Sequence, residues 1–130
     1  MAGKVQVVAA LIWQGGKFMI CQRAETKTRG LQWEFVGGKV ERGETLQAAL
    51  VRECEEELGI VVKPGGIFAE TDYVYDDMSI HLTLFDTEIV SGTPKNKEHA
   101  GINWISPQEI PKYRFSDADS LLLNKILKLN

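Results

Sequence analysis

The sequence predicts an α+β fold in which a mixed sheet lies between helices. Three observations support this fold class. Segments that are rich in valine or alternate in polarity, as strands do, recur along the chain, and two other segments have the periodicity of amphipathic helices. No internal repeat, low-complexity segment or linker separates them. We therefore expect residues 1–130 to form one domain with two principal helices, a short third helical turn and about six strands.

Composition and charge restrict the partners. Hydrophobic residues make up 44% of the chain and charged residues 25%, as in ordinary soluble domains. A formal net charge of −3 argues against a general nucleic-acid or membrane binder, and a polyanionic ligand would need local cations. The sequence has neither a long apolar run nor a cleavable leader. We expect a cytoplasmic monomer or homodimer, with Cys21 and Cys54 as buried free thiols.

The first third of the chain predicts a β-hairpin and a polar loop. Residues 4–13 are apolar and rich in valine, residues 14–17 form a turn, and residues 18–23 return as the partner strand. Residues 24–32 are the loop. Arg23 lies at the end of the returning strand, where it could either bind phosphate or remain solvated.

The second half predicts further strands and a final helix. Residues 60–62 form a short strand that the Pro-Gly-Gly sequence at 64–66 ends, and residues 67–75 and 78–90 form a second hairpin. His81, in an apolar strand, is typical of a hydrogen-bonded structural histidine. After a loop and a strand at residues 102–105, capping patterns begin at Ser106 and, in the same manner, at Ser116. The last helix is expected to bury Leu121, Leu122, Ile126 and Leu127.

An acidic helix is predicted within residues 38–60, GKVERGETLQAALVRECEEELGI. Glu53, Glu56 and Glu57 share one helical face, and an apolar stripe of Val51, Cys54 and Leu58 lies roughly opposite. The acidic face is either simply solvated or holds Mg²⁺, which prefers oxygen ligands. The flanking residues favour the metal. Arg52 can pair with Glu55 or Glu56, Gly37 and Gly38 allow close backbone approach, Glu44 suits the helix start, and Gly59 suits the helix end.

Nine residues of this segment match every fixed position of the pattern G-x5-E-x7-R-E-U-x-E-E-x-G-U: Gly38, Glu44, Arg52, Glu53, Cys54, Glu56, Glu57, Gly59 and Ile60. This is the Nudix box, and the chain resembles the Nudix hydrolases. The resemblance covers nearly the whole chain. It implies the Nudix α/β/α sandwich and Mg²⁺-dependent hydrolysis of a nucleoside diphosphate linked to another group, with Mn²⁺ as a possible substitute.

The resemblance also implies roles for individual residues. Glu53, Glu56 and Glu57, with the Gly38 carbonyl, correspond to the metal ligands, and Glu98 corresponds to a loop carboxylate that reaches the metal. Glu53 is the expected general base, with Glu98 and Glu44 as rivals. Arg52 would orient a carboxylate. A glutamate that is bound to metal is a poor base, so the sequence leaves this assignment open.

The segment that leads into the box, W-E-F-x-G-G-K, is similar to that of MutT-type nucleoside triphosphate pyrophosphohydrolases, which release a monophosphate and pyrophosphate. Val36 stands where those proteins usually have proline. By the same resemblance, Arg23 is expected to bind phosphate and Phe35 to lie at the base pocket. Lys39 either binds phosphate or only balances the acidic helix, and Tyr75 is a further candidate at the base pocket. Phe35 is also a candidate for the core.

The base itself stays open. Phe115-Ser116-Asp117-Ala118-Asp119 departs from the F-x-x-A-N pattern with which MutT proteins bind oxidised guanine, and (d)CTP pyrophosphohydrolases show a similar A-D. Ionised Asp119 would accept hydrogen bonds only, which suits donors on cytosine or guanine. We expect clean-up of 8-oxo-dGTP, or else hydrolysis of (d)CTP or 5-modified cytidine triphosphates. A nucleotide sensor without activity, an interaction scaffold and a structural helix acid at Asp119 are the remaining alternatives.

Overall fold

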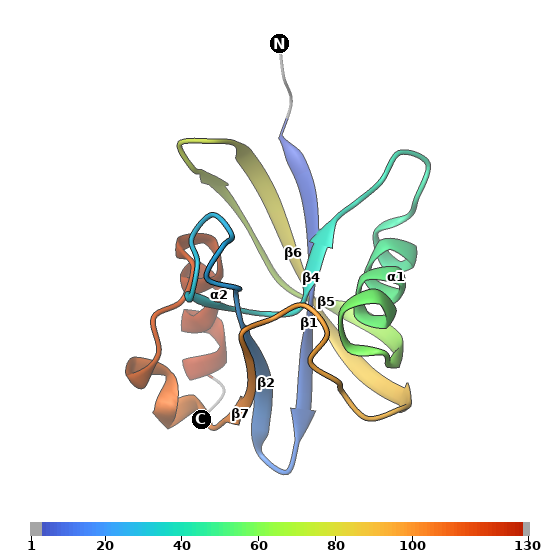
Figure 1. The fold of residues 1–130 in the computed structure, drawn as a ribbon, viewed down its shortest axis with the longest axis vertical. Coiled ribbons are helices and arrows are strands. Elements are labelled where there is room, and N and C mark those ends of the chain that lie inside the picture. The colour runs from blue at the N-terminus through green and yellow to red at the C-terminus, as the bar shows by residue number, and fades with distance from the viewer. Residues whose placement is uncertain (1–3, 129–130) are drawn as a thin grey trace.

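The chain folds into a mixed sheet with one helix on each side, as Figure 1 shows for this computed structural model, which describes residues 4–128. The helices are α1 (Leu46–Leu58) and α2 (Asp117–Leu127), and a 3₁₀ helix, η1 (Pro107–Lys112), precedes α2. The strands are β1 (Val5–Gln14), β2 (Lys17–Gln22), β3 (Trp33–Glu34), β4 (Gly37–Lys39), β5 (Val61–Val74), β6 (Ser79–Ser91) and β7 (Gly101–Ile105). The predicted α+β sandwich with a mixed sheet is confirmed.

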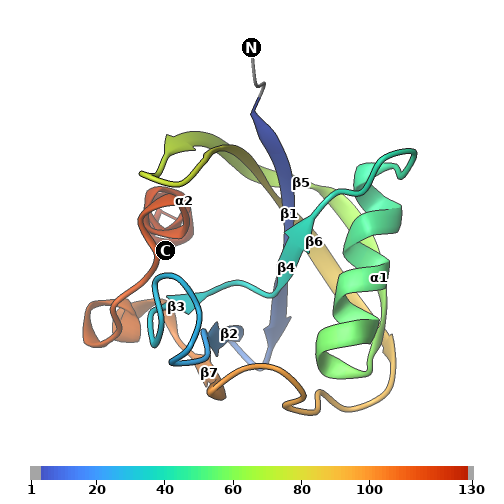
Figure 2. The same ribbon diagram turned by 45° about the horizontal axis from the view of Figure 1, so that its top comes forward.

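Strand β1 organises the sheet. One edge pairs in parallel with β6 along eight residues, from Val5 to Ile12. The other edge is shared, because β4 pairs antiparallel with Val7, Val8 and Ala9, whereas β2 pairs at Trp13 and Gln14. Two strands on one edge must diverge, and in Figure 2 β4 and β2 leave β1 in different directions. Residues 7–9 of β1 and residues 37–39 of β4, which pair here, line the candidate site described below.

The alternation of side chains along β1 supplies both layers of the core. Val8, Ala10 and Ile12 pack with Leu50, Cys54 and Leu58 of α1. Ala9 and Leu11 point to the other face and join the cluster that contains Leu122 and Ile126 of α2. A continuous apolar strand, buried on both faces, is therefore what a sheet between two helices requires.

Both predicted hairpins form. The β1–β2 turn joins Gln14 to Lys17, and β5 pairs antiparallel with β6 around the Asp76–Asp77 turn. His81 is hydrogen-bonded by both ring nitrogens, at 2.6 Å from Asp72 and 2.8 Å from Glu70, and these two bonds raise its pKa. Cys21 and Cys54 are buried and free, as expected.

Four details of the predicted elements are wrong. The Pro-Gly-Gly sequence at 64–66 does not end a strand, because β5 lies at the sheet edge and absorbs it as register shifts. The sheet has seven strands, where the sequence predicted about six. In α2 the buried stripe lies at Ala118, Leu122, Leu123 and Ile126, while Leu121 and Leu127 are exposed. The capping box is present at Ser106 but not at Ser116, whose hydroxyl lacks a partner among the described residues.

Helix α1 begins and ends at residues suited to those positions. Thr45 caps its first turn by accepting a hydrogen bond from the Ala48 N–H at 3.0 Å. Gly59 closes it with a φ of 67°, as predicted for this position. Its buried face is Ala49, Leu50, Cys54 and Leu58, so Val51 of the predicted stripe is only half-buried. No helix within residues 4–128 is long and apolar enough to cross a bilayer.

Gly37 provides a test of the β1–β4 pairing. A Cβ at this position would overlap the backbone carbonyl of Val8, whereas a Cβ at Gly66 would meet nothing within 4 Å. We expect Gly37→Ala to lower the free energy of unfolding by about 2 kcal/mol or more, because backbone must move. The control, Gly66→Ala, should change it by less than about 0.5 kcal/mol. Equal denaturation midpoints for the two variants would contradict the proposed close approach.

Candidate active site

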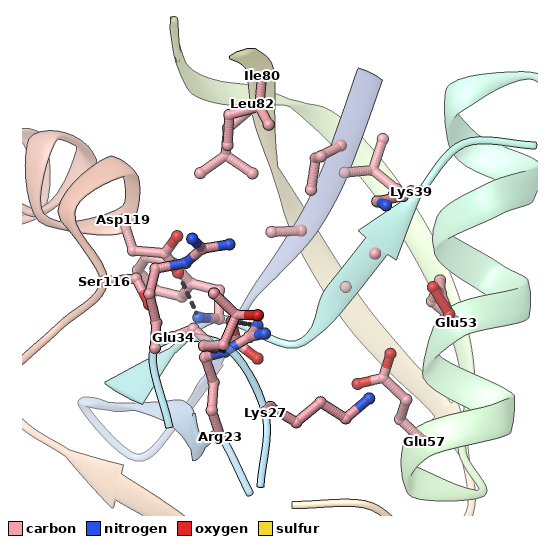
Figure 3. A pocket seen from close by; sticks show the side chains of 18 of the residues that line it. Arg23, Lys27, Glu34, Lys39, Glu53, Glu57, Ile80, Leu82, Ser116 and Asp119 are labelled. Carbon is pink, nitrogen blue, oxygen red and sulfur yellow. Dashed lines mark hydrogen bonds and ion pairs between the residues drawn. The ribbon is translucent and has the colours of Figure 1, made fainter. Parts of the chain in front are cut away.

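A cavity of about 510 Å³ lies between α1 and the start of α2. Figure 3 shows Glu53 and Glu57 of α1 on one side, and Asp119 and Ser116 on the opposite side. Between them lie Lys39 on β4, the apolar side chains of Ile80 and Leu82 on β6, and the basic side chains of the loop at residues 23–32. The end of the cavity at α1 is therefore acidic, and cationic and apolar side chains line the part between this end and Asp119.

The structure brings most of the sequence-predicted site residues together. The cavity is lined by ten of them: Arg23, Phe35, Gly38, Lys39, Glu53, Glu56, Glu57, Tyr75, Glu98 and Asp119. Glu44 and Arg52 do not line it. Arg52 belongs to α1 itself and Glu44 lies just before the helix, and the two are paired with each other.

Arg52 is fixed mainly by Glu44. Its guanidinium donates from Nε to Oε2 at 2.8 Å and from Nη2 to Oε1 at 2.9 Å, a bidentate pair. This pairing, with a further bond from the Glu41 N–H, lowers the pKa of Glu44 to about 2. Weaker contacts reach Glu56 and Glu53 at 3.4 Å. The predicted pairing with Glu56 forms, but the stronger partner is Glu44, which lies just before the helix, eight residues earlier.

The acidic row is unequally exposed. The side chains of Glu53 and Glu57 are 14% and 13% exposed, whereas Glu56 is 54% exposed. Burial, followed by the charge of Glu57, raises the pKa of Glu53 to about 7. The backbone of Gly38 lies directly against this carboxylate, since a Cβ at Gly38 would overlap it. Two confined carboxylates without a covering cation repel each other.

The donor chemistry of this wall suits a hard divalent cation. Carboxylate and carbonyl oxygens are the ligands that Mg²⁺ prefers, and a cation would relieve the repulsion that raises the pKa of Glu53. Gly38 leaves the space that the Glu53 carboxylate occupies. Among residues 4–128, no three His, Cys, Asp or Glu side chains already converge as a finished metal site. The chemical types of these residues therefore suit Mg²⁺, but their side chains are not arranged around a single point.

Arg23 lies directly after β2 and is held in place. Its Nη1 donates to Glu34 at 2.9 Å and its Nε donates to the Thr28 carbonyl at 2.8 Å. Lys27, which the sequence analysis did not single out, extends towards Glu57 in Figure 3. Arg23, Lys27 and Lys39 thus place three cationic side chains around the cavity.

Asp119 lies in α2 at the end of the cavity far from the acidic row. It is 7% exposed, and its Oδ2 accepts a hydrogen bond from the Phe35 N–H at 2.9 Å. Burial, then the charge of Glu34, raises the pKa of Asp119 to about 8. The sequence analysis expected an ionised group that only accepts. A pKa raised in this direction favours the protonated carboxyl near neutral pH, and that form can donate a hydrogen bond as well as accept one.

The two aromatic residues predicted at the base pocket, Phe35 and Tyr75, both pack against other side chains. Phe35 is 3% exposed and packs between Phe18 and Phe115, with ring centroids 6.0 and 6.4 Å away. Phe35 is therefore a core residue whose edge reaches the cavity. Tyr75 accepts a hydrogen bond from the Ala118 N–H at 2.9 Å, and the guanidinium of Arg29 covers its ring.

Sequence reasoning missed His99. Its side chain is only 6% exposed, and its Nε2 lies 3.2 Å from Glu57 and 3.8 Å from Glu34. Its Nδ1 is buried and has no partner among the described residues. The predicted neighbour Glu98 is exposed at the cavity rim. No local signal in the sequence distinguishes a buried histidine in this polar loop, because the contact with α1 spans some forty residues of chain.

Comparison with known proteins agrees with this geometry. A family model described as the NUDIX domain matches residues 3–124. The CTP pyrophosphohydrolase of Escherichia coli (strain K12) is 38% identical over 96% of this chain and 93% of that protein. The 8-oxo-dGTP diphosphatase of the same strain is 31% identical over 97% and 98%. The crystal structure of the MutT protein from Methanosarcina mazei Go1 superposes with a TM-score of 0.88 at 27% identity, over 98% and 95% of the two chains.

The fold and the acid-lined cavity, together with these similarities, define an enzyme of the hydrolase class. The chain belongs to the NUDIX domain family. The resemblance that the box indicated is therefore confirmed. Enzymes of this family generally use a divalent metal and act on small-molecule nucleotides.

The raised pKa of Asp119 predicts a pH dependence of stability. A carboxyl whose pKa rises from about 4 unfolded to about 8 folded holds its proton longer in the folded state, so its contribution to stability falls as the pH rises between those values. We expect Asp119→Asn to gain stability relative to the wild type between pH 5 and pH 8, by at most about 1.4 kcal/mol per pH unit. Urea unfolding across this range measures the difference. A difference that does not change with pH would contradict the protonated, buried carboxyl.

Proposed function

We propose that this protein is a Mg²⁺-dependent nucleoside triphosphate pyrophosphohydrolase that releases a nucleoside monophosphate and pyrophosphate. One observation carries the proposal: the acidic row of α1, three basic side chains and a buried hydrogen-bonding group on α2 all line one cavity. Such a cavity can hold a phosphate chain between carboxylates and cations while a base occupies the far end. The family and the relatives named above support the same reaction.

The metal would be held by Glu53, Glu56 and Glu57, with the Gly38 carbonyl, and Glu98 would approach from its loop. When bound, Mg²⁺ or Mn²⁺ supplies charge neutralisation for the phosphate chain. Glu56 and Glu98 are exposed, and Glu56 is held only by long contacts of 3.4 and 3.5 Å with Arg52, so both can turn towards the row. Arg52, locked to Glu44, keeps the outer end of the row in place.

Glu53 is the proposed general base. Burial and the charge of Glu57 raise its pKa to about 7, which suits a group that accepts a proton from water near neutral pH. A bound cation would lower this pKa again, so the roles of base and metal ligand must be shared along the row. Glu44 is a poorer rival, because both of its oxygens bind Arg52 and its pKa is about 2. Glu98 is an exposed group at the rim, better suited to approach the metal than to hold a water in place.

Lys39 and Arg23 are proposed to bind the phosphate chain, and Lys27 joins them because its side chain extends across the cavity towards Glu57 (Figure 3). Glu34 fixes Arg23 from behind, so the guanidinium needs little reordering when phosphate arrives. Lysine acts here as a point charge, whereas arginine can bind two oxygens at once.

The base is proposed to meet Asp119. A protonated carboxyl donates and accepts, as asparagine does, so Asp119 can serve the role that asparagine serves in MutT-like proteins. This supports 8-oxo-dGTP as a substrate and clean-up of the nucleotide pool as the role. Hydrolysis of (d)CTP or of 5-modified cytidine triphosphates is the second candidate, favoured by the 38% identity to a CTP pyrophosphohydrolase.

The remaining properties are proposals of the same kind. We expect residues 1–130 to act as one unit, as a monomer or a homodimer, on free nucleotides in the cytoplasm. A net charge of −3 gives no support to nucleic acid or a membrane as a partner.

Substitutions along the acidic row test the proposed function. Glu56→Gln and Glu57→Gln should each lower the rate of pyrophosphate release by about 100-fold or more while leaving the fold intact, because each removes a carboxylate that would hold the metal, whose charge neutralises the phosphate chain. The assay offers 8-oxo-dGTP, dGTP, dCTP, CTP and 5-modified cytidine triphosphates. Glu55→Gln is the matched control, since Glu55 belongs to the same helix but is exposed and does not line the cavity.

Wild-type activity in both variants would overturn the metal assignment. Absence of turnover with every triphosphate in the wild type would overturn the enzyme assignment and leave the nucleotide-sensing alternative. A loss as large in Glu55→Gln would show that net charge, rather than the row itself, matters.

A further inference from the structure

The wall next to Asp119 offers no free aromatic face. Within residues 4–128, the phenyl-type rings that line the cavity are those of Phe35 and Tyr75. Phe35 is enclosed by Phe18 and Phe115 and is 3% exposed. Tyr75 is fixed by the hydrogen bond from the Ala118 N–H, the Arg29 guanidinium lies over its ring, and the Tyr73 ring packs against it with the centroids 4.7 Å apart. A base that stacks at this end must therefore use another flat group.

Arg29 supplies such a group. Its guanidinium carbon lies 3.9 Å from the centroid of the Tyr75 ring, and its Nη1 donates to Asp77 at 3.0 Å. The side chain is only 20% exposed and lines the cavity. Its charge also reaches Asp119, where it opposes the rise in pKa. The guanidinium is thus held from two sides near the group proposed to bind the base.

The loop that carries Arg29 is tightly folded. Arg29 and Leu31 have φ values of 58° and 63°, in the left-handed region, which costs a non-glycine residue about 1 kcal/mol or more. Tertiary contacts have to hold a loop in this conformation. The contacts with Tyr75 and Asp77 hold the loop of residues 23–32 against the β5–β6 turn, although the two segments are far apart in the sequence.

We propose that the Arg29 guanidinium, backed by Tyr75 and aligned by Asp77, is the face on which the substrate's base stacks. A guanidinium is planar and weakly hydrated, and its two faces allow it to lie between an aromatic ring and a base. Arg29 is then a specificity-determining residue. The apolar wall of Met78, Ile80 and Leu82 lines the same cavity and excludes water from the stack.

The inference rests on the proposed nucleotide substrate but not on catalysis, so binding tests it without turnover. Titration calorimetry measures the Kd of 8-oxo-dGMP, of CMP and of deoxyribose 5-phosphate, which lacks a base. The proteins are the wild type, Arg29→Met, which removes the plane and the charge, and Arg29→Lys, which keeps the charge without the plane. Arg114→Met is the matched control, because Arg114 is exposed and does not line the cavity.

For whichever of the two nucleotides the wild type binds more tightly, we expect Arg29→Met and Arg29→Lys to raise the Kd by about tenfold, the usual scale for loss of a base stack. Binding of deoxyribose 5-phosphate should not change in either variant, and Arg114→Met should match the wild type throughout. Circular dichroism establishes that each variant is folded, and Arg29→Lys carries the test if Arg29→Met is not.

Three results would overturn the proposal. Equal weakening for deoxyribose 5-phosphate would make Arg29 a phosphate ligand. Tighter nucleotide binding by Arg29→Met would show that Arg29 merely covers Tyr75. A wild type that binds both nucleotides no more tightly than deoxyribose 5-phosphate would show that no stacking face exists. Failure of the proposed reaction is seen separately, as absence of pyrophosphate release from triphosphates.

Discussion

Repulsion between confined carboxylates on one turn of α1 is the constraint on which the rest of the site depends. Glu53 and Glu57 are largely withdrawn from water, and burial with their mutual charge raises the pKa of Glu53 to about 7. Arg52, gripped by Glu44, compensates only the outer side of the row. The inner side faces the cavity, where the Nε2 of His99 lies 3.2 Å from Glu57 and Lys27 extends towards it, and a bound cation would add to the compensation that these side chains offer. Because a bound cation would relieve the repulsion between the carboxylates, this repulsion favours cation binding.

The sheet topology makes this arrangement possible. Because β2 and β4 share one edge of β1, the two halves of the sheet diverge, and the space between them opens towards both helices. Gly38 on β4 lies against the Glu53 carboxylate, while Phe35, two residues before β4, donates its N–H to Asp119. A few residues of chain therefore connect the acidic end of the cavity with the base end. Arg29 adds a third wall by tying the preceding loop to the β5–β6 turn.

Local sequence patterns predicted the elements well where local physics decides them. The hairpin turns, the shared face of the glutamates, Gly59 at the helix end and the capping box at Ser106 all form as expected. Errors arose where tertiary contacts decide. Pro64 is tolerated because β5 lies at an edge, and α2 rotates its buried face by one residue so that Asp119 points inward. The i+4 partner of Arg52, Glu56, was predicted from helical spacing and is found. Its stronger partner Glu44 lies outside the helix, and the partners of His99 and Arg29 lie far along the chain, so no periodicity could identify them.

The most direct measurement is a crystal structure of the protein soaked with Mg²⁺ and a non-hydrolysable nucleoside triphosphate. We predict density for at least one ion between the carboxylates of Glu53, Glu56 and Glu57 and the phosphate oxygens, with the base at the Asp119 end. A nucleotide bound elsewhere, or these three carboxylates turned towards bulk water without an ion, would contradict the account.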